Sequence, residues 1–507
     1  MRREERPTSG PRSDPADVDP AQGELGDMDV ESFRRHGYEV IDWIADYLED
    51  IGELPVLAQV HPGEIRGRLP AHPPREPEPF DAALRDLDEL LLPGITHWNH
   101  PAFHAYFAIT GSGPGILGEA LIAALNVNGM LWRTSPSATE LEEVVLDWLR
   151  QMLGLAPAFR GVICDTASVA TLAALAAARE RADLDVRQRG MAGRPDLPML
   201  RVYTSEQAHS SIEKGAITLG IGRDGVRQIP TDDRYRMDPA ALAEAIRDDA
   251  RFGYRPIAIV PTIGTTSTTS VDPVAEIADV RDELAEELGH EVWLHVDGAY
   301  GGMVGLCEEL RWVLDGVDRA DSFVTNPHKW LFTPIDCSAF FVRDVDTLTR
   351  AFSLVPEYLS TDDEDVTDYM DWGVQLGRRF RALKLWLVIR YFGVDGLAAR
   401  IRHHVAQAQR VARWVDRHPE LELMAPVPMS TVCFRARPPG LHDDEEGLSG
   451  LNREWLAAVN ATGQAFLSHT ELDGRYVLRL ATGNLRTTDE RLDATLALLD
   501  EELARLH

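Results

Sequence analysis

A regular alternation of short apolar runs with helical stretches is the strongest restriction on how this chain can fold. The alternation extends from about residue 113 into the 380s. It is typical of α/β proteins, in which helices cover a mostly parallel sheet. Open sheets of this kind bind ligands at the carboxyl ends of their strands. Functional residues are therefore expected after the predicted strands, which are GVIC (161–164), MLRVYT (199–204), PIAIVPT (256–262), EVWLHVD (291–297) and SFVT (322–325).

The segments on either side of this region have other patterns. Apolar residues recur at three- and four-residue steps from about Asp29 to Ile51, which predicts an amphipathic helix. A proline-rich stretch at 69–80 follows, so the first hundred residues have no evident core and are expected to pack on another subunit. A helix and strand-like runs after Lys384 indicate a smaller α+β domain. The predicted organisation is a disordered tail (1–27), a helical dimerisation segment (28–112), a large domain (113–383) and a small C-terminal domain (384–507).

The charge balance excludes several classes of partner. The chain has 82 acidic residues against 51 Lys and Arg, a formal net charge of -31. Nucleic acids and anionic membranes are bound by clustered basic residues, so neither is an expected partner. The four cysteines lack metal-ligand spacing and Pro101 separates His100 from His104, so no metal site is expected. Without a secretory or membrane-spanning stretch, the expected location is cytoplasmic.

Lysine is rare in this chain, occurring only at Lys214, Lys329 and Lys384. Lys329 directly follows the predicted strand SFVT, in the largely apolar run NPHKWLF. Its stem could simply pack beneath Trp330 while the ammonium reaches water. A primary amine can also condense with an aldehyde, which the guanidinium of arginine cannot do. Lys329 is therefore a candidate Schiff-base residue.

Two other strand ends carry residues that complement such a lysine. Asp297 ends the strand EVWLHVD, and a lone aspartate there could be only a helix cap or a turn former. Paired with Lys329, it matches the requirement of pyridoxal phosphate for an anion beside its pyridine nitrogen. The cofactor phosphate could bind at Thr166, Ala167 and Ser168, which open a helix after GVIC. Ordinary N-capping explains those three residues equally well, and the same holds for Thr266 after PIAIVPT.

Several separated motifs occur in the order found in a known family. They are THWNHP, TSPSATELE, TAS, QAHSS, HVDGAY, NPHKW and LGRRFRALKLW. The chain from about Asp29 to its C-terminus resembles the pyridoxal-phosphate-dependent group II decarboxylases, and within them the aromatic-L-amino-acid decarboxylases. The resemblance implies the fold type I architecture and a homodimer whose N-terminal helical segment wraps the partner. It also implies that residues 113–383 bind the cofactor.

The resemblance also implies a role for individual residues. Lys329 would bind the cofactor as an aldimine, Asp297 would pair with its ring nitrogen, and His209 would stack on the ring. Ala299 would pack on the opposite ring face, and Thr266 would lie near the ring hydroxyl. The remaining cofactor contacts would be Thr166, Ala167, Ser168 and Asn326 at the phosphate, His328 nearby and Gly377 from the neighbouring subunit. The implied substrate residues are Trp98, Tyr106, Phe107, Ile109 and Met130.

The implied reaction is decarboxylation of an aromatic L-amino acid to an arylalkylamine through a quinonoid intermediate. Tyr358, in VPEYLSTDDEDVTDY, occupies the position of the tyrosine that reprotonates the substrate carbon in the family. Phenylalanine at that position is associated with aldehyde synthases, so Tyr358 favours simple decarboxylation. Ile109 replaces a hydroxyl-bearing residue and disfavours dihydroxyphenylalanine, whereas Gly377 leaves room for an indole. Tryptophan, phenylalanine and tyrosine all remain open as substrates.

Other functions compete with this interpretation. Within the same fold, the chain could decarboxylate a non-aromatic amino acid or act as an aminotransferase, which would need an arginine that the sequence alone cannot place. A non-catalytic protein that keeps the fold as a binding module is a third possibility. The retention of Lys329, Asp297, His209 and Tyr358 together disfavours that third possibility.

Overall fold

A seven-stranded sheet forms the centre of the computed structural model, which describes residues 26–354, 366–441 and 444–506. Its strand order is β1-β7-β6-β5-β4-β2-β3. All neighbours pair in parallel except β7, which runs antiparallel to both β1 and β6. The predicted mostly parallel sheet is thus confirmed. Its strands are β1 (Arg160–Cys164), β2 (Leu200–Ser205), β3 (Val226–Ile229), β4 (Arg255–Val260), β5 (Trp293–Asp297), β6 (Ser322–Thr325) and β7 (Ser338–Val342).

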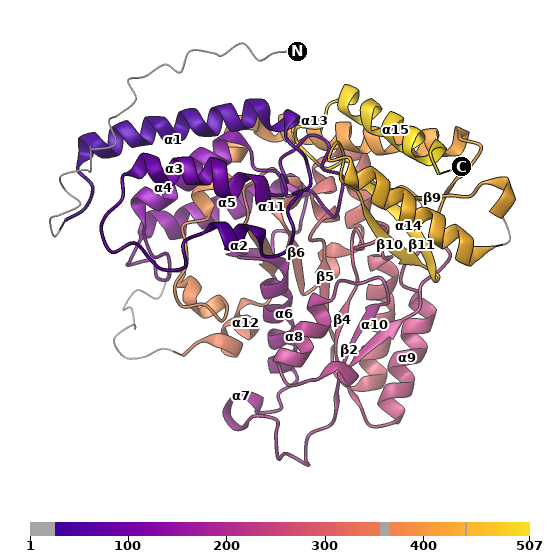
Figure 1. Ribbon diagram of the computed structural model, residues 1–507. Helices are drawn as coiled ribbons and strands as arrows, with labels where there is room; N and C mark the ends of the chain where they lie inside the picture. The colour runs from indigo at the N-terminus through magenta and orange to yellow at the C-terminus, as the bar shows by residue number, and fades with distance from the viewer. Residues whose placement is uncertain (1–25, 355–365, 442–443, 507) are drawn as a thin grey trace, which may run out of the picture.

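Helices cover both faces of this sheet (Figure 1). Because both faces are covered, the strands are apolar on each side: Trp293 packs in one hydrophobic cluster and its neighbour Leu294 in the other. One cluster joins the sheet to α5, α9 and α10, and the other joins it to α6, α8 and α12. The helices of this region are α4 (Gly113–Leu125), α5 (Pro136–Leu153), α6 (Ala167–Arg181), α7 (Val186–Arg189), α8 (Ser211–Thr218), α9 (Pro239–Arg251), α10 (Val274–Leu288), α11 (Pro327–Trp330) and α12 (Val345–Phe352).

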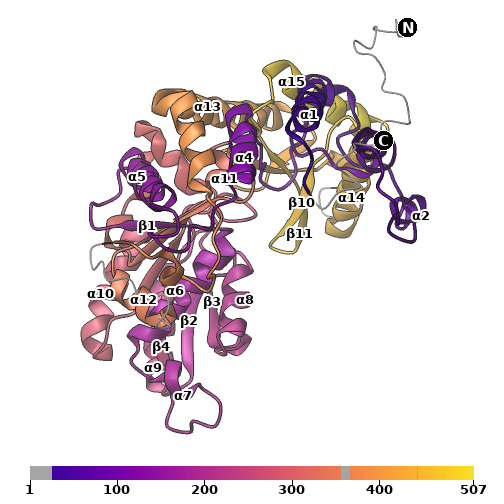
Figure 2. The same cartoon turned by 90° about the vertical axis from the view of Figure 1, so that its left-hand side faces the viewer.

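The N-terminal helices α1 (Val30–Asp50), α2 (Glu64–Arg68) and α3 (Phe80–Asp86) lie apart from the sheet. The Asp29 carboxylate caps α1 by accepting hydrogen bonds from two backbone N–H groups of its first turn. Figures 1 and 2 show α1 along the top of the molecule, and it buries only Ser32 against this chain. Its apolar side chains Val30, Phe33, Tyr38 and Ile41 stay exposed. The predicted helix is confirmed, and its docking on a second subunit stays a prediction.

The C-terminal part contains a second, antiparallel sheet of order β10-β11-β9-β8. The two predicted strand runs and the closing helix are confirmed as β9, β11 and α15. Helix α13 bends at Gly393, whose φ of 65° favours glycine, and its residues join the cores of both sheets. The domain boundaries stay predictions. The elements are α13 (Ala382–Arg417), β8 (Leu421–Leu423), β9 (Thr431–Ala436), α14 (Glu445–Ala461), β10 (Ser468–Leu472), β11 (Arg475–Ala481) and α15 (Asp489–Ala504).

None of the described helices combines the length and the apolar character needed to cross a bilayer.

Candidate active site

A cavity of about 430 Å³ opens at the carboxyl ends of β1, β4, β5 and β6, where α/β sheets bind ligands. The β10–β11 hairpin of the second sheet closes one side of it. Most of the predicted site residues line this cavity, although they come from distant parts of the sequence. They are Thr166, Ala167, Ser168, His209, Thr266, Asp297, Ala299, Asn326, His328 and Lys329, together with Trp98, Tyr106, Phe107 and Ile109.

Three predicted residues are not part of this lining. Gly377 and Met130 are described but lie outside the cavity, and Tyr358 lies outside the described residues. Gly377 and Met130 belong to segments that contact each other: the Arg378 N–H donates to Asn128 Oδ1 at 2.9 Å, and the Met370 N–H donates to the Met130 carbonyl at 3.0 Å. The contribution of Gly377 to a neighbouring subunit's site and the substrate-binding role of Met130 both stay predictions.

Lys329 and Asp297 follow adjacent parallel strands, so both face the cavity. Strand β5 ends at Asp297, which is 3% exposed and whose Oδ1 accepts the Ala299 N–H at 3.0 Å. Lys329 is half-buried, and burial lowers the pKa of its ammonium. Asp297 opposes that pKa shift and Arg479 adds to it. Burial therefore makes the Lys329 ammonium easier to deprotonate than that of a free lysine, as a nucleophilic amine requires.

Two histidines, both with lowered pKa values, line the cavity. His328 Nδ1 accepts the Cys337 N–H at 3.0 Å, and His209 Nδ1 accepts the Ser211 N–H at 3.1 Å. In each neutral ring the proton must therefore lie on Nε2. Burial lowers the pKa of His328 to about 3, with Lys329 adding to the shift. Desolvation also lowers the pKa of His209, against the opposing charge of Asp297.

The polar groups at the end of β1 and beside Lys329 fit the phosphate end of pyridoxal phosphate. The Thr166 side chain makes no capping hydrogen bond at α6, and the first N–H groups of a helix have no partner within it. Positive backbone dipoles at such a terminus bind phosphate. Within the described residues, the buried Asn326 Oδ1 and Thr262 Oγ1 have no hydrogen-bond partner, although buried polar atoms normally have one. The backbone N–H groups at the start of α6, the Asp297 carboxylate and the Lys329 amine together fit the phosphate, the ring nitrogen and the aldehyde of the cofactor.

Arg479 is a candidate functional residue that the sequence interpretation missed. It lies on β11, is 4% exposed and lines the cavity. Its Nε donates to the Ser267 carbonyl at 2.9 Å and its Nη1 donates to the Tyr106 carbonyl. Its Nη2 has no hydrogen-bond partner among the described residues. An arginine inside the apolar run RYVLRLA is the signal that points to it, because an unpaired charge is rarely buried without function.

An aromatic wall faces these polar groups. The rings of Trp98 and Tyr106 stack with centroids 5.7 Å apart, and those of Phe107 and Tyr300 stack at 3.8 Å. Tyr106 has a φ of 52°, which is uncommon for a residue other than glycine. The Ser468 hydroxyl accepts its N–H at 3.2 Å, and Arg479 binds its carbonyl. The second sheet therefore holds Tyr106 in a conformation that costs energy.

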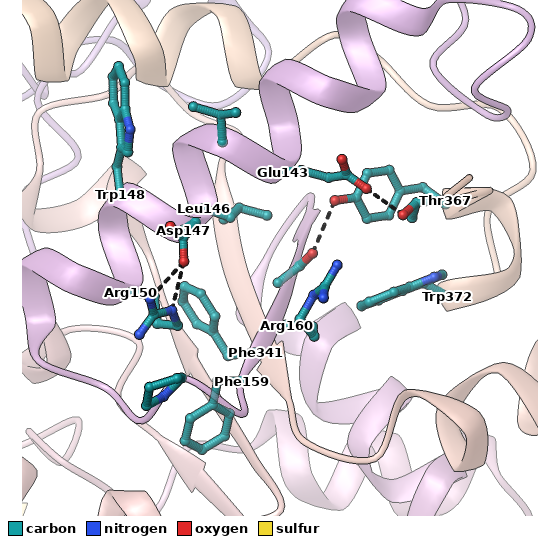
Figure 3. Close-up of a pocket in the computed structure, with 14 residues that line it drawn as sticks. Glu143, Leu146, Asp147, Trp148, Arg150, Phe159, Arg160, Phe341, Thr367 and Trp372 are labelled. Carbon is teal, nitrogen blue, oxygen red and sulfur yellow. Dashed lines mark hydrogen bonds and ion pairs between the residues drawn. The ribbon is translucent and has the colours of Figure 1, made fainter. Parts of the chain in front are cut away.

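A different hollow, of about 450 Å³, lies along α5 and the outer edge of β1 (Figure 3). It is bordered by Trp148, Arg160 and Trp372, and Figure 3 shows the Arg150–Asp147 ion pair on one side. None of the predicted cofactor or substrate residues lines it. No group of metal-binding side chains occurs among the described residues either. The cavity around Lys329 is therefore the candidate active site.

Comparisons with known proteins agree on the family of this chain. The family model of the pyridoxal-dependent decarboxylase conserved domain matches residues 62–437. Phenylacetaldehyde synthase of Arabidopsis thaliana is 40% identical, over 95% of this chain and 98% of the relative. Tryptophan decarboxylase 2 of Oryza sativa subsp. japonica is also 40% identical, over 95% and 96%.

A solved structure extends the agreement to the fold. The crystal structure of Oryza sativa TDC with PLP and tryptamine superimposes with a TM-score of 0.90 at 38% identity, covering 95% of this chain and 99% of that one. The predicted fold type I architecture is confirmed. The chain belongs to the pyridoxal-dependent decarboxylase family.

Proposed function

We propose that this protein decarboxylates a free aromatic L-amino acid to the corresponding arylalkylamine and carbon dioxide, with pyridoxal 5′-phosphate as cofactor. The observation that carries the proposal is one cavity lined by Lys329, Asp297, an aromatic wall and Arg479, whose Nη2 has no hydrogen-bond partner in the described part of the chain. Relatives at 40% identity, among them a tryptophan decarboxylase, support the aromatic substrate class.

The cofactor would be held at its phosphate and at its aldehyde carbon. Thr166, Ala167 and Ser168 would bind its phosphate at the N-terminus of α6, and Asn326 would add a side-chain contact. Lys329 would bind its aldehyde carbon. When bound, the cofactor supplies an electron-accepting ring for the pair released as the carboxylate leaves.

Residues of this chain would set the charge and the orientation around that ring. The Asp297 carboxylate would keep the ring nitrogen protonated, because a buried anion favours a positive charge beside it. His209 would cover one ring face and Ala299 the other, with Thr266 near the ring hydroxyl. The Nε2–H of His328 would donate a hydrogen bond near the phosphate and the reacting amine.

Arg479 and the aromatic wall would select the substrate. The guanidinium would offer the α-carboxylate an N–H that no described residue pairs with, and burial strengthens that attraction. Trp98, Tyr106 and Phe107 would enclose the aromatic side chain, and Ile109 adds an apolar surface without a hydroxyl. An apolar pocket discriminates poorly between related rings, so tryptophan, phenylalanine and tyrosine are all proposed substrates.

We propose that the active form is a homodimer in the cytoplasm. The exposed apolar face of α1 supports dimerisation, because a monomer rarely leaves such a face open to water. Gly377 and Met130 lie outside their own chain's cavity, as residues donated to the partner would. Tyr358 would also act at a shared site, as the proton donor to the substrate carbon.

Oxidative conversion to an aldehyde is the second candidate function, favoured by the 40% identity to a phenylacetaldehyde synthase. In that reaction the amino acid, dioxygen and water give the aldehyde, carbon dioxide, ammonia and hydrogen peroxide. Tyr358 decides between the two outcomes in our proposal. Tyr358→Phe is expected to divert part of the turnover to aldehyde, ammonia and peroxide.

Product analysis tests the proposed function directly. Purified protein loaded with pyridoxal 5′-phosphate is incubated with L-tryptophan, L-phenylalanine, L-tyrosine and, as a non-aromatic control, L-glutamate. Equal amounts of amine and carbon dioxide from an aromatic substrate, without peroxide, support the proposal. Aldehyde and peroxide from the wild-type protein, or turnover of L-glutamate alone, would overturn it.

A further inference from the structure

We propose that Arg381 is a positioning residue that fixes the phosphate-binding turn relative to the Ile335 side of the substrate cavity. The inference rests on the proposed function, because it assigns that turn to the cofactor and that side to the substrate. Arg381 itself does not line the cavity. It would act only through two aspartates, each adjacent in sequence to a residue that does.

The geometry of the Arg381 guanidinium carries the proposal. Its Nη2 donates to Asp165 Oδ1 at 3.1 Å. Its Nε and Nη2 donate to the two carboxylate oxygens of Asp336 at 2.8 and 3.2 Å. The pairing with Asp336 is therefore bidentate, the arrangement in which arginine fixes a carboxylate in both distance and direction.

Each aspartate is covalently next to the site. Asp165 precedes Thr166, which begins the phosphate-binding turn, and Asp336 follows Ile335, which lines the cavity. A displacement of either carboxylate therefore moves a cavity residue one peptide away. Gln375 Nε2 also donates to Asp165 Oδ2 at 2.7 Å.

Local helix energetics do not explain an arginine at this position. Arg381 is the N-cap residue of α13, where the helix dipole disfavours a positive charge and Ser, Thr, Asp or Asn would satisfy the first N–H groups. The Arg381 side chain is only 7% exposed, so its charge must be paired inside the protein. Although burial opposes ionisation of Asp336, the Arg381 guanidinium lowers the pKa of that carboxyl. The two aspartates thus compensate a charge that the helix alone would reject.

The two ion pairs lead to separable effects. Asp165→Asn weakens the hold on the phosphate-binding turn and leaves Asp336 paired. Asp336→Asn does the reverse and loosens the side of the cavity at Ile335. Arg381→Lys weakens both, because an ammonium cannot reproduce the bidentate fork. A purely structural role would instead lower stability in all three variants without separating cofactor from substrate.

Binding measurements on cofactor-free protein test the turn independently of turnover. The dissociation constant of pyridoxal 5′-phosphate is measured by absorbance titration, and inorganic phosphate is used as a second probe in thermal shifts. Arg381→Lys and Asp165→Asn should each weaken the binding of both probes roughly tenfold. Loss of a supporting hydrogen-bond partner has an effect of this size at other binding sites. Asp336→Asn should leave the binding of pyridoxal 5′-phosphate and of inorganic phosphate unchanged.

Steady-state kinetics with saturating cofactor test the side of the cavity at Ile335. Arg381→Lys and Asp336→Asn should raise the KM of the aromatic amino acid severalfold, whereas Asp165→Asn should not. Arg379→Lys is the matched control, since Arg379 is half-exposed and pairs with Glu119 instead. It should leave both the cofactor constant and KM unchanged.

Two outcomes would overturn the proposal. Variants that lose stability but keep wild-type binding and KM would show a structural role only. Equal changes of both readouts in Asp165→Asn and Asp336→Asn would show general loosening. If Arg381→Lys fails to fold, the two isosteric asparagine variants still decide between these results. The phosphate measurements do not depend on turnover of an amino acid. Failure of the proposed function can therefore be distinguished from failure of the role proposed for Arg381.

Discussion

The guanidinium carbon of Arg479 lies 4.5 Å from the ring centroid of Phe107, and Lys329 Nζ lies 5.4 Å from the same centroid. An arginine of the second sheet and a lysine that follows β6 thus share one aromatic neighbour. Cation–π attraction helps to place Arg479, whose charge in turn lowers the pKa of Lys329. The cavity therefore combines an amine of lowered pKa with a guanidinium whose Nη2 has no partner among the described residues.

Replacing Arg479 should weaken the binding of the amino-acid substrate more than the binding of the amine product. In Arg479→Lys the fork that reaches both the Tyr106 carbonyl and the cavity is lost. Losing one charged hydrogen bond costs about 2 kcal/mol, so kcat/KM should fall roughly thirtyfold. Inhibition by the arylalkylamine product, which has no carboxylate, is the internal control and should change little. Equal weakening of amino acid and amine would contradict the assignment of Arg479 to the carboxylate.

Replacing Lys329 should remove the colour of the cofactor-loaded protein. Lys329→Ala deletes the amine that binds the cofactor aldehyde, so the near-visible absorption band should disappear. Turnover should fall at least about 10²-fold, the lower end for a positioned proton-transfer group. Lys214→Ala is the control, because Lys214 is exposed on α8 and does not line the cavity. A yellow and active Lys329→Ala protein would disprove the assignment.

The sequence predicts the part of the site that follows from local pattern. Asp297 and Lys329 come directly after apolar strands of one sheet, and parallel strands place their carboxyl ends at the same edge. The alternation does not reveal that β7 inserts antiparallel between β1 and β6, because strand order depends on long-range packing.

Arg479 shows what local pattern cannot supply. It lies on a strand of the second sheet, and it reaches the cavity only because that sheet docks beside Tyr106 and Ser267. Tyr300 was missed for a similar reason, since its role depends on the stack with Phe107. The positions of Met130 and Gly377 outside the cavity are likewise a matter of tertiary structure.

A methyl group at Gly483 should disturb the aromatic wall by displacing Tyr300, which stacks on Phe107. A Cβ there would lie 2.6 Å from the Tyr300 hydroxyl oxygen, which hydrogen-bonds to Ser430. Gly483→Ala should therefore lower the free energy of unfolding by about 2 kcal/mol, as overpacking does, and raise KM as Phe107 shifts. In the control Gly450→Ala, the new Cβ meets no atom of the described residues within 4 Å. Because alanine favours a helix more than glycine does, the free energy of unfolding measured in urea should rise by up to about 1 kcal/mol. Wild-type stability and KM in Gly483→Ala would refute this role of Tyr300.

Stability should fall steeply as the pH drops from 7 to 5. Burial lowers the pKa of five histidines from 6.5 to between about 3 and about 4, so below pH 6.5 the unfolded chain binds protons that the folded chain does not. Folding stability therefore decreases as pH falls through this window. Asp272 acts in the opposite sense, because burial raises its pKa to about 7 and its proton is held in the folded state. The five histidines are His100, His104, His295, His328 and His404.

Because five histidines act against the single Asp272, the free energy of unfolding should decrease by several kcal/mol between pH 7 and pH 5. Each proton contributes about 1.4 kcal/mol per pH unit. Urea unfolding of cofactor-free protein at the two pH values measures it. His404→Asn keeps an acceptor for the Trp330 N–H, which donates to His404 Nδ1 at 3.0 Å, and should remove about one proton from the dependence. His469→Asn, which replaces an exposed histidine instead, is the matched control. Equal stability at both pH values, or equal effects of the two variants, would show that the buried histidines do not control acid stability.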